Sequence, residues 1–149
     1  MKLEASTFVY ASWVEALVTD VNLRTDSFRM LLVTRDYIPQ TSSHSLLKDI
    51  SHEVKGLGYQ RQVLQNVKLK RTEENGISTI NMIADNVTYV ADGSDWTAHR
   101  YVIYDETAPD SPLFCYGLLD ARGKDVFVTD GNSLTVQFDP KGLFGVSIG

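Results

Sequence analysis

Hydrophobic and polar positions alternate along most of this chain, and this spacing is typical of short β-strands. In residues 27–34, SFRMLLVT, both alternating sets are largely apolar, which predicts a strand buried on both of its faces. Two later runs flank the pair Asn75 and Gly76, a strong indication of a tight hairpin turn. The predicted strands cover residues 27–34, 62–72, 77–84, 86–91, 99–106, 113–121 and 143–148, and residues 125–139 are predicted to form a hairpin around 130–132.

Apolar residues recur at helical rather than alternating spacing in residues 44–54, which predicts one short helix there. Either Ser42 or Ser43 would cap the start of this helix, because a serine hydroxyl can accept a free backbone N–H at that position. Gly56 and Gly58 follow as the residues that would end it.

The N-terminal segment, residues 5–21, combines two patterns. Apolar residues follow a helical spacing from Val14 through Leu17 and Val18 to Val21. The many Thr, Val and aromatic residues of the same segment favour a strand instead. We expect a helix here, with its apolar face packed on the rest of the protein.

Short strands at regular spacing, separated by turns, predict a mainly β protein with an antiparallel β-sandwich or jelly-roll-like architecture and one or two short helices. The chain has 149 residues, and no linker-like or low-complexity run divides it. We therefore predict a single domain over residues 1–149. Within it, residues 1–23 would be either a contact arm or a helix packed on the sandwich.

Charge and composition narrow the classes of partner. The net charge is −5, which argues against binding along the outside of a nucleic-acid duplex, although a total of this kind describes no local patch. The most apolar N-terminal run, residues 8–18, is too short to span a bilayer and is interrupted by Glu15. We expect neither direct nucleic-acid binding nor membrane insertion. The single cysteine, Cys115, cannot close an internal disulfide bond, which fits synthesis in a reducing compartment.

The stretch HSLLKDISHE, residues 44–53, is the best candidate for chemistry. On a helix, His44 and His52 lie two turns apart and face roughly the same way, which raises the hypothesis of a metal-dependent hydrolase. The stretch does not match the His-Glu-x-x-His pattern, because the residue four positions after His52 is Gly56. Zinc needs three or four converging ligands, and no tight cluster is present in the sequence. We therefore predict no metal site.

Other kinds of active site are also missing from the sequence. Cys115 lies between Phe114 and Tyr116 in an apolar strand, where a thiol usually packs as a small hydrophobic group. There is no Gly-x-Ser-x-Gly nucleophile motif and no glycine-rich phosphate loop. We predict no catalytic residue and no cofactor, so the chain is predicted not to be an enzyme.

Residues 26–67 contain a series of short motifs in a fixed order. A strand beginning with Asp is followed by a Tyr-x-Pro loop, a Ser-His pair, an Asp-apolar-x-x-Glu-Val run, a Gly-x-Gly-Tyr turn and an Arg-Gln-x-Leu strand start. They occupy residues 26–33, 37–39, 43–44, 49–54, 56–59 and 61–64. This order and spacing resemble a widespread family of small virion structural proteins of tailed bacteriophages.

The later strands in residues 84–91, 100–117 and 128–144 are similar to the same family, so that the resemblance covers roughly residues 24–146. Two features depart from the family pattern. Tyr89 stands where Trp is common, and residues 117–125 are more charged than usual. The first 23 residues match least.

The resemblance implies a protein of the phage particle made in the bacterial host cytoplasm. Its members are connected most closely with head decoration, or cement, proteins of β-sandwich type. The implied partners are the major capsid protein or other virion proteins, together with self-association as a dimer or trimer. A tail, baseplate or fibre-associated structural protein is the alternative.

Such a role requires an apolar contact surface with a polar rim. The N-terminal segment is our candidate, and the partner interface is predicted at Phe8, Tyr10, Trp13 and Val14. The other interpretation of the segment is that it simply covers one face of a sheet.

Overall fold

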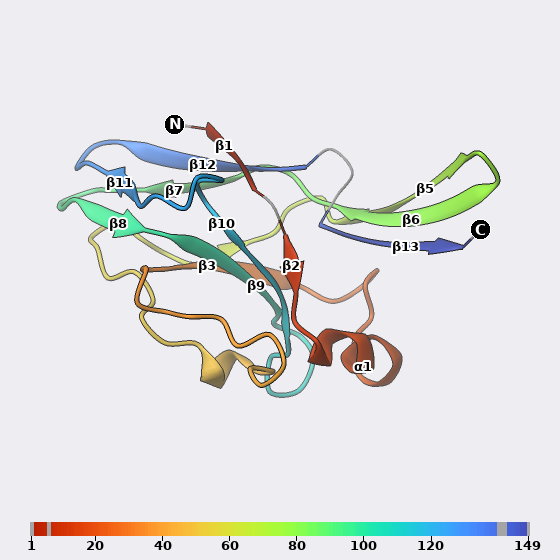
Figure 1. Ribbon diagram of the computed structural model, residues 1–149. Helices are drawn as coiled ribbons and strands as arrows, with labels where there is room; N and C mark the ends of the chain where they lie inside the picture. Colours follow the sequence, from red (N-terminus) through yellow and green to blue (C-terminus); the bar gives the residue numbers. More distant parts are fainter. Residues whose placement is uncertain (1, 6, 140–142, 149) are drawn as a thin grey trace.

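Two layers of β-sheet form the body of the protein (Figure 1). The computed structural model describes residues 2–5, 7–139 and 143–148, with the backbone alone at 2–5 and 144–148. The first layer is a five-stranded sheet in the order β2-β10-β9-β3-β4. Its strands are β2 (Phe8–Val9), β10 (Leu113–Leu118), β9 (Arg100–Asp105), β3 (Phe28–Val33) and β4 (Gln62–Val63).

The second layer consists of a three-stranded sheet and a strand pair. The sheet has the order β1-β12-β7, formed by β1 (Lys2–Ala5), β12 (Ser133–Phe138) and β7 (Val87–Val90). The pair joins β11 (Val126–Val128) to β8 (Trp96–Ala98). All these ladders are antiparallel except the one between β1 and β12. The predicted mainly β, sandwich-like fold is confirmed.

Strand β3 is buried on both faces, as its sequence predicts, because each face of the five-stranded sheet is covered. Phe28, Met30 and Leu32 face the second layer and join the larger core. Leu31 and Val33 face the opposite way, into a second and smaller core. The buried members of that smaller core are Tyr10, Leu31, Val33, Tyr37, Val102, Tyr104 and Leu113. Irregular chain covers this side, with Leu47 and Ile50 packed against the cluster.

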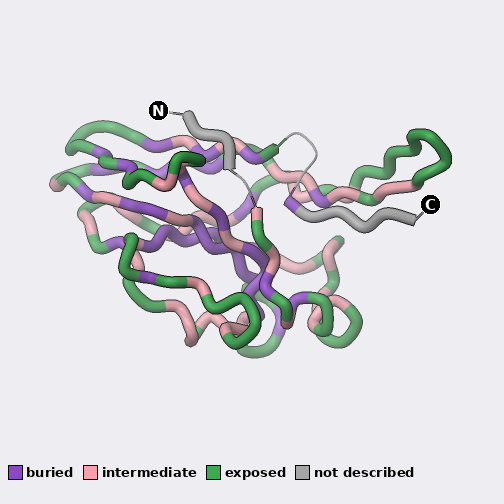
Figure 2. The backbone as a smooth tube through the Cα atoms, viewed as in Figure 1, coloured by how far each residue is buried: buried purple, intermediate pink, exposed green. Residues whose placement is uncertain are grey.

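A third sheet projects from the body as a narrow extension, which we call the wing (Figure 1). It has the strand order β13-β6-β5, with β5 (Lys68–Glu74), β6 (Ile77–Ile83) and β13 (Phe144–Ile148). Asn75 and Gly76 form its two-residue turn, and both have positive φ, 52° and 77°. That geometry suits the twist of a hairpin and confirms the predicted turn. Figure 2 shows that the described side chains of the wing are mostly exposed or half-buried.

The N-terminal helix is present as α1 (Ser12–Thr19), shorter than the predicted segment. Its inward positions are Trp13, Ala16 and Leu17, which pack against the larger core. Val14 and Val18 face solvent instead. Of the predicted apolar face, Leu17 and Val21 do pack against the larger core, whereas Val14 and Val18 do not.

Two predicted elements are wrong. Residues 44–54 contain only one turn of 3-10 helix, η1 (Leu47–Asp49), because the Asp49 carboxylate binds the N–H groups of Ser45 and Leu46 and the chain then extends. The hairpin at 125–139 does not exist either, since β11 pairs with β8 and β12 pairs with β7. Strands β1, β2 and β8 were not predicted.

Within the described residues, no helix is long and apolar enough to cross a bilayer.

Candidate contact surface

The structure separates the two histidines of HSLLKDISHE. The ring of His44 stacks on Tyr37 at 5.5 Å between centroids, and its Nδ1 lies 2.9 Å from the Tyr37 hydroxyl. That hydroxyl also lies 2.8 Å from the hydroxyl of Tyr10, so His44 completes a row of polar groups at the edge of the smaller core. His52 is exposed and contacts Ser51. Among the described residues, no group of His, Cys, Asp or Glu side chains is arranged to hold a metal ion.

Glu53, Tyr59 and Arg61, which come from three successive sequence motifs, form a hydrogen-bonded network. Arg61 forms a two-pronged ion pair with it, Nε to Oε2 at 2.9 Å and Nη2 to Oε1 at 2.8 Å. The Tyr59 hydroxyl donates to Glu53 Oε2 at 2.7 Å and accepts the N–H of Leu32 at 2.9 Å. Burial works to raise the pKa of Glu53, but the hydrogen bonds from Arg61 and Tyr59 outweigh it and hold this pKa below its usual value. The network ties the segment after HSLLKDISHE to the central strand β3.

Replacing Glu53 with glutamine should lower the free energy of unfolding at pH 7 by roughly 1–2 kcal/mol, because the Arg61 guanidinium then loses its charged partner. The folded pKa of Glu53 lies below the unfolded one, so its contribution is present above the unfolded pKa and is lost as pH falls through the folded pKa. Urea unfolding of the wild type and of the variant gives the two free energies of unfolding at pH 7 and again at pH 3. We expect the difference between wild type and variant to be smaller at pH 3.

Glu106→Gln is the matched control, because its ion pair with Arg29 has the same N–O distance of 2.8 Å but its carboxylate is 40% exposed, against 27% for Glu53. We expect little change in that variant, since exposed pairs contribute little. Equal losses in the two variants would contradict a special role for the Glu53 network.

The Gly-x-Gly-Tyr turn permits a close approach of two loops. A Cβ atom at Gly56 would lie 2.5 Å from a ring carbon of Trp96, a buried residue of β8. Gly58 has φ +86°, and a Cβ there would lie 2.6 Å from the backbone nitrogen of Asp92. Both glycines therefore serve packing, since any larger residue would push the loop from its neighbours.

His99 and Cys115 are buried parts of the framework. His99 is held by Asp125, with Nδ1 and Oδ1 2.8 Å apart, and burial lowers the pKa of its imidazole. Cys115 is fully buried in β10, and burial raises the pKa of its thiol well above the usual value. A buried thiol of raised pKa carries little thiolate, which is the reactive form. Neither residue has the environment of a nucleophile.

The predicted partner interface divides into buried and exposed residues. Tyr10 and Trp13 are fully buried, Tyr10 in the smaller core and Trp13 in the larger one. The prediction is corrected at these two positions, because a core side chain cannot meet a partner. Phe8 is 54% exposed and Val14 is 65% exposed, so both stay predicted contacts.

Val18 lies on the same exposed face of α1 as Val14 and was not among the predicted contacts. It is 83% exposed and lies one helical turn after Val14, so the two valines form an apolar ridge along the outer face of α1. The sequence carried a signal for this pair, since their spacing is that of a helix face, but it did not show which face packs inward. We call Phe8, Val14 and Val18 the N-terminal surface.

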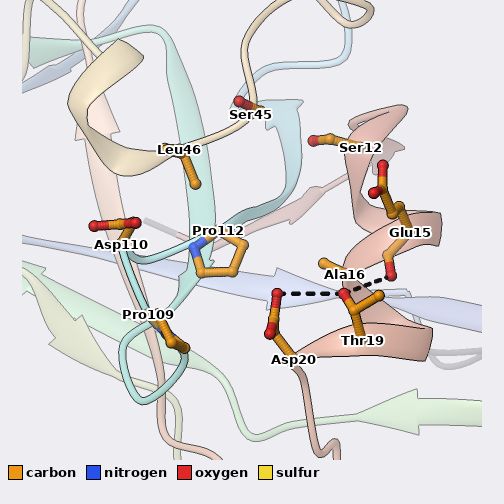
Figure 3. A pocket seen from close by; sticks show the side chains of 10 residues that line it. All are labelled: Ser12, Glu15, Ala16, Thr19, Asp20, Ser45, Leu46, Pro109, Asp110 and Pro112. Atoms are coloured by element: carbon orange, nitrogen blue, oxygen red, sulfur yellow. Dashed lines mark hydrogen bonds between the residues drawn. The ribbon is translucent and has the colours of Figure 1, made fainter.

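A pocket of about 220 Å³ opens on the other side of α1 (Figure 3). Residues from α1 and its end face two loops of the body across it. The lining residues are Ser12, Glu15, Ala16, Thr19, Asp20, Ser45, Leu46, Pro109, Asp110 and Pro112. Three of these ten carry carboxylates and none carries a cation or a histidine, so the lining is acidic. None of Phe8, Val14 and Val18 lines it.

Two carboxyl groups, the buried Asp105 and the half-buried Asp26, interact where the chain after α1 meets the end of β9. Asp105 is fully buried at the end of β9, and its Oδ1 accepts the N–H groups of Thr107 at 2.8 Å and Ala108 at 3.0 Å. Burial, and then a hydrogen bond with the side chain of Asp26, raises the pKa of Asp105 to about 7. The alternation of the predicted strand 99–106 gives no indication that Asp105 has a carboxyl partner.

No known family model matches this chain, and no curated protein or solved structure is significantly similar to it.

Proposed function

We propose that this protein is a non-enzymatic structural protein of a bacteriophage particle, which binds the outside of the assembled head and stabilises it. The observation that carries the proposal concerns the motifs shared with the phage family. Their polar residues His44, Asp49, Glu53, Tyr59 and Arg61 all have hydrogen-bond partners within the chain. A motif made of such residues preserves a fold and needs no substrate to explain it.

The N-terminal surface supports a contact role. Phe8, Val14 and Val18 expose apolar side chains, which is the kind of residue found at the centre of an interface. A protein that binds the assembled shell and not its free subunit stabilises the shell by mass action. Because many copies act on one shell, modest affinity for each copy gives a large combined effect.

The decisive experiment heats purified particles, or treats them with a chelator, with and without this protein. We expect particles that lack it to disassemble at lower temperature, and re-addition of the purified protein to restore the midpoint. An unchanged midpoint would overturn the head-binding role. Immunogold labelling of intact particles then separates head from tail, and label on the tail alone would favour the alternative of a tail or baseplate component.

Substituting the ridge tests which surface makes the contact. We expect Val14→Gln with Val18→Gln to weaken co-sedimentation with such particles by on the order of tenfold or more, because two exposed apolar groups no longer become buried. Glutamine favours helices, so α1 should persist, which circular dichroism can check. The matched control is Ile38→Gln with Leu57→Gln, two exposed apolar residues outside α1, and it should bind as wild type does. Equal binding by both double variants would exclude the ridge as the contact.

A further inference from the structure

The free edge of the wing has an unusual order of charges. Strand β5 pairs with β6 on one side, and in the sheet order β13-β6-β5 its other side is an edge. The β5 sequence is KLKRTEE, so basic residues fill its first part and acidic residues its end. Edge strands usually carry charges that discourage pairing with another chain. Here the positive and negative charges are separated along the strand. If a second copy of β5 runs antiparallel to the first, its acidic end lies opposite the basic residues of the first copy.

One antiparallel register brings opposite charges together at every charged position near its centre. If Thr72 of one copy lies opposite Thr72 of another, Arg71 lies opposite Glu73 of the second copy. In the same register Lys70 lies opposite Glu74 of the second copy. Residues that lie directly opposite each other on antiparallel strands project from the same face of the sheet. The two side chains of each of these pairs are therefore close enough to interact. A register centred on Arg71 would instead place two arginines opposite each other.

The side chains concerned are exposed, although Arg71 already has partners within the chain, since its Nε donates to Ser78 Oγ at 3.1 Å. Within one chain Arg71 and Glu73 form an ion pair of 2.9 Å whose side chains are 68% and 65% exposed. Such an exposed pair contributes little, so its exchange for the equivalent pair between copies requires little energy. Ile80 lies beside Arg71 on β6 and is 47% exposed, which leaves apolar surface for the paired side chains to cover.

We propose that the free edge of β5 binds the same edge of a second copy of this chain around a two-fold axis. The product is a continuous six-stranded sheet with the order β13-β6-β5-β5-β6-β13. Residues 70–74 of each copy form the pairing, a short interface, so the dimer is weak and depends on protein concentration. It forms in the free protein and does not depend on binding to a phage head.

Two variants test the pairing, one that reverses the charges of the basic part of β5 and one that reverses those of its acidic part. Sedimentation equilibrium over a wide range of protein concentration should show a reversible dimer of the wild type, weakened by added salt. The variant K70E/R71E makes the edge acidic, and E73K/E74K makes it basic. Each alone should weaken dimer formation by on the order of 30-fold, because four attractive pairs become repulsive.

The decisive sample is an equal mixture of the two variants. All four cross-strand pairs are again of opposite sign, so the mixture should form a heterodimer at least as stable as the wild-type dimer. The control K48E/K55E changes the net charge by the same amount at two exposed lysines outside the wing, and it should dimerise as wild type does. A wild type that stays monomeric at all concentrations would overturn the proposal. So would a mixture that remains monomeric while both variants are folded by circular dichroism.

Discussion

Trp13→Ala is expected to lower the free energy of unfolding by about 3–5 kcal/mol, the range typical of removing a large aromatic side chain from a core. Trp13 is fully buried, and its ring stacks on Phe114 at 4.4 Å between centroids and meets Phe28 edge-on at 6.3 Å. It is the one fully buried side chain of α1, and Ala16 and Leu17 pack beside it against the same core. Its loss leaves a cavity beneath the helix, and equilibrium unfolding in urea measures the effect.

Trp13→Phe is the matched control. Among the described residues the indole N–H has no hydrogen-bond partner, so the smaller ring loses packing volume but no hydrogen bond. We expect a loss well below that of alanine. If Trp13 were an interface residue, as its sequence context suggested, alanine would leave the isolated protein as stable as before, and that outcome would contradict the packed position of α1.

Asp105→Asn is expected to stabilise the protein at pH 8 by roughly 2–4 kcal/mol, because each pKa unit is worth about 1.4 kcal/mol. The carboxyl has an ordinary pKa of 3.8 and a folded pKa of about 7. Between these values the folded protein holds a proton that the unfolded chain has released. Stability therefore falls as pH rises through this window. Asparagine is always neutral, and its Oδ1 can still accept the N–H groups of Thr107 and Ala108.

The gain from Asp105→Asn should disappear as pH approaches 4, where the wild-type carboxyl is protonated when folded. Asp49 offers the matched control, since its carboxylate also accepts two backbone N–H groups but its pKa is lowered by them. Asp49→Asn should therefore destabilise the protein at pH 7 and lose that effect at low pH. Unfolding curves from pH 4 to pH 8 give both results, and a pH-independent gain for Asp105→Asn would contradict the raised pKa.

Local sequence pattern determined the parts of the fold in which neighbouring residues decide the geometry. The alternation in β3 and the Asn75-Gly76 turn were predicted correctly, because burial of alternating residues and positive φ angles are local requirements. The predicted helix at 44–54 failed although its apolar spacing suited one. There Val33 bridges to Glu53 and Leu46 bridges to Pro112, so contacts with distant chain override the local preference.

The predicted hairpin at 125–139 failed for a related reason. The turn itself exists, but the N–H of Asp130 donates to Asp95 and that of Gly131 donates to Ala91. These bonds direct β11 toward β8 and β12 toward β7, and no local pattern identifies such partners. The same limit affected the contact surface, since Trp13 and Val14 are both apolar and only the packing of α1 decides which of them faces solvent.

The two cores on opposite faces of the five-stranded sheet imply that parts of the molecule differ in local stability. Strands β3 and β9 pair over six positions between these cores, so their opening requires nearly global unfolding. The segment over the smaller core is joined to the body by two isolated bridges and a few backbone hydrogen bonds instead of a strand ladder, so we expect it to open more readily than the sandwich. In the wing, Met82 is the one buried residue of β5 and β6, so we expect these two strands to open more readily still. A chain built in this way can remodel its outer segments against a partner while its centre keeps one structure.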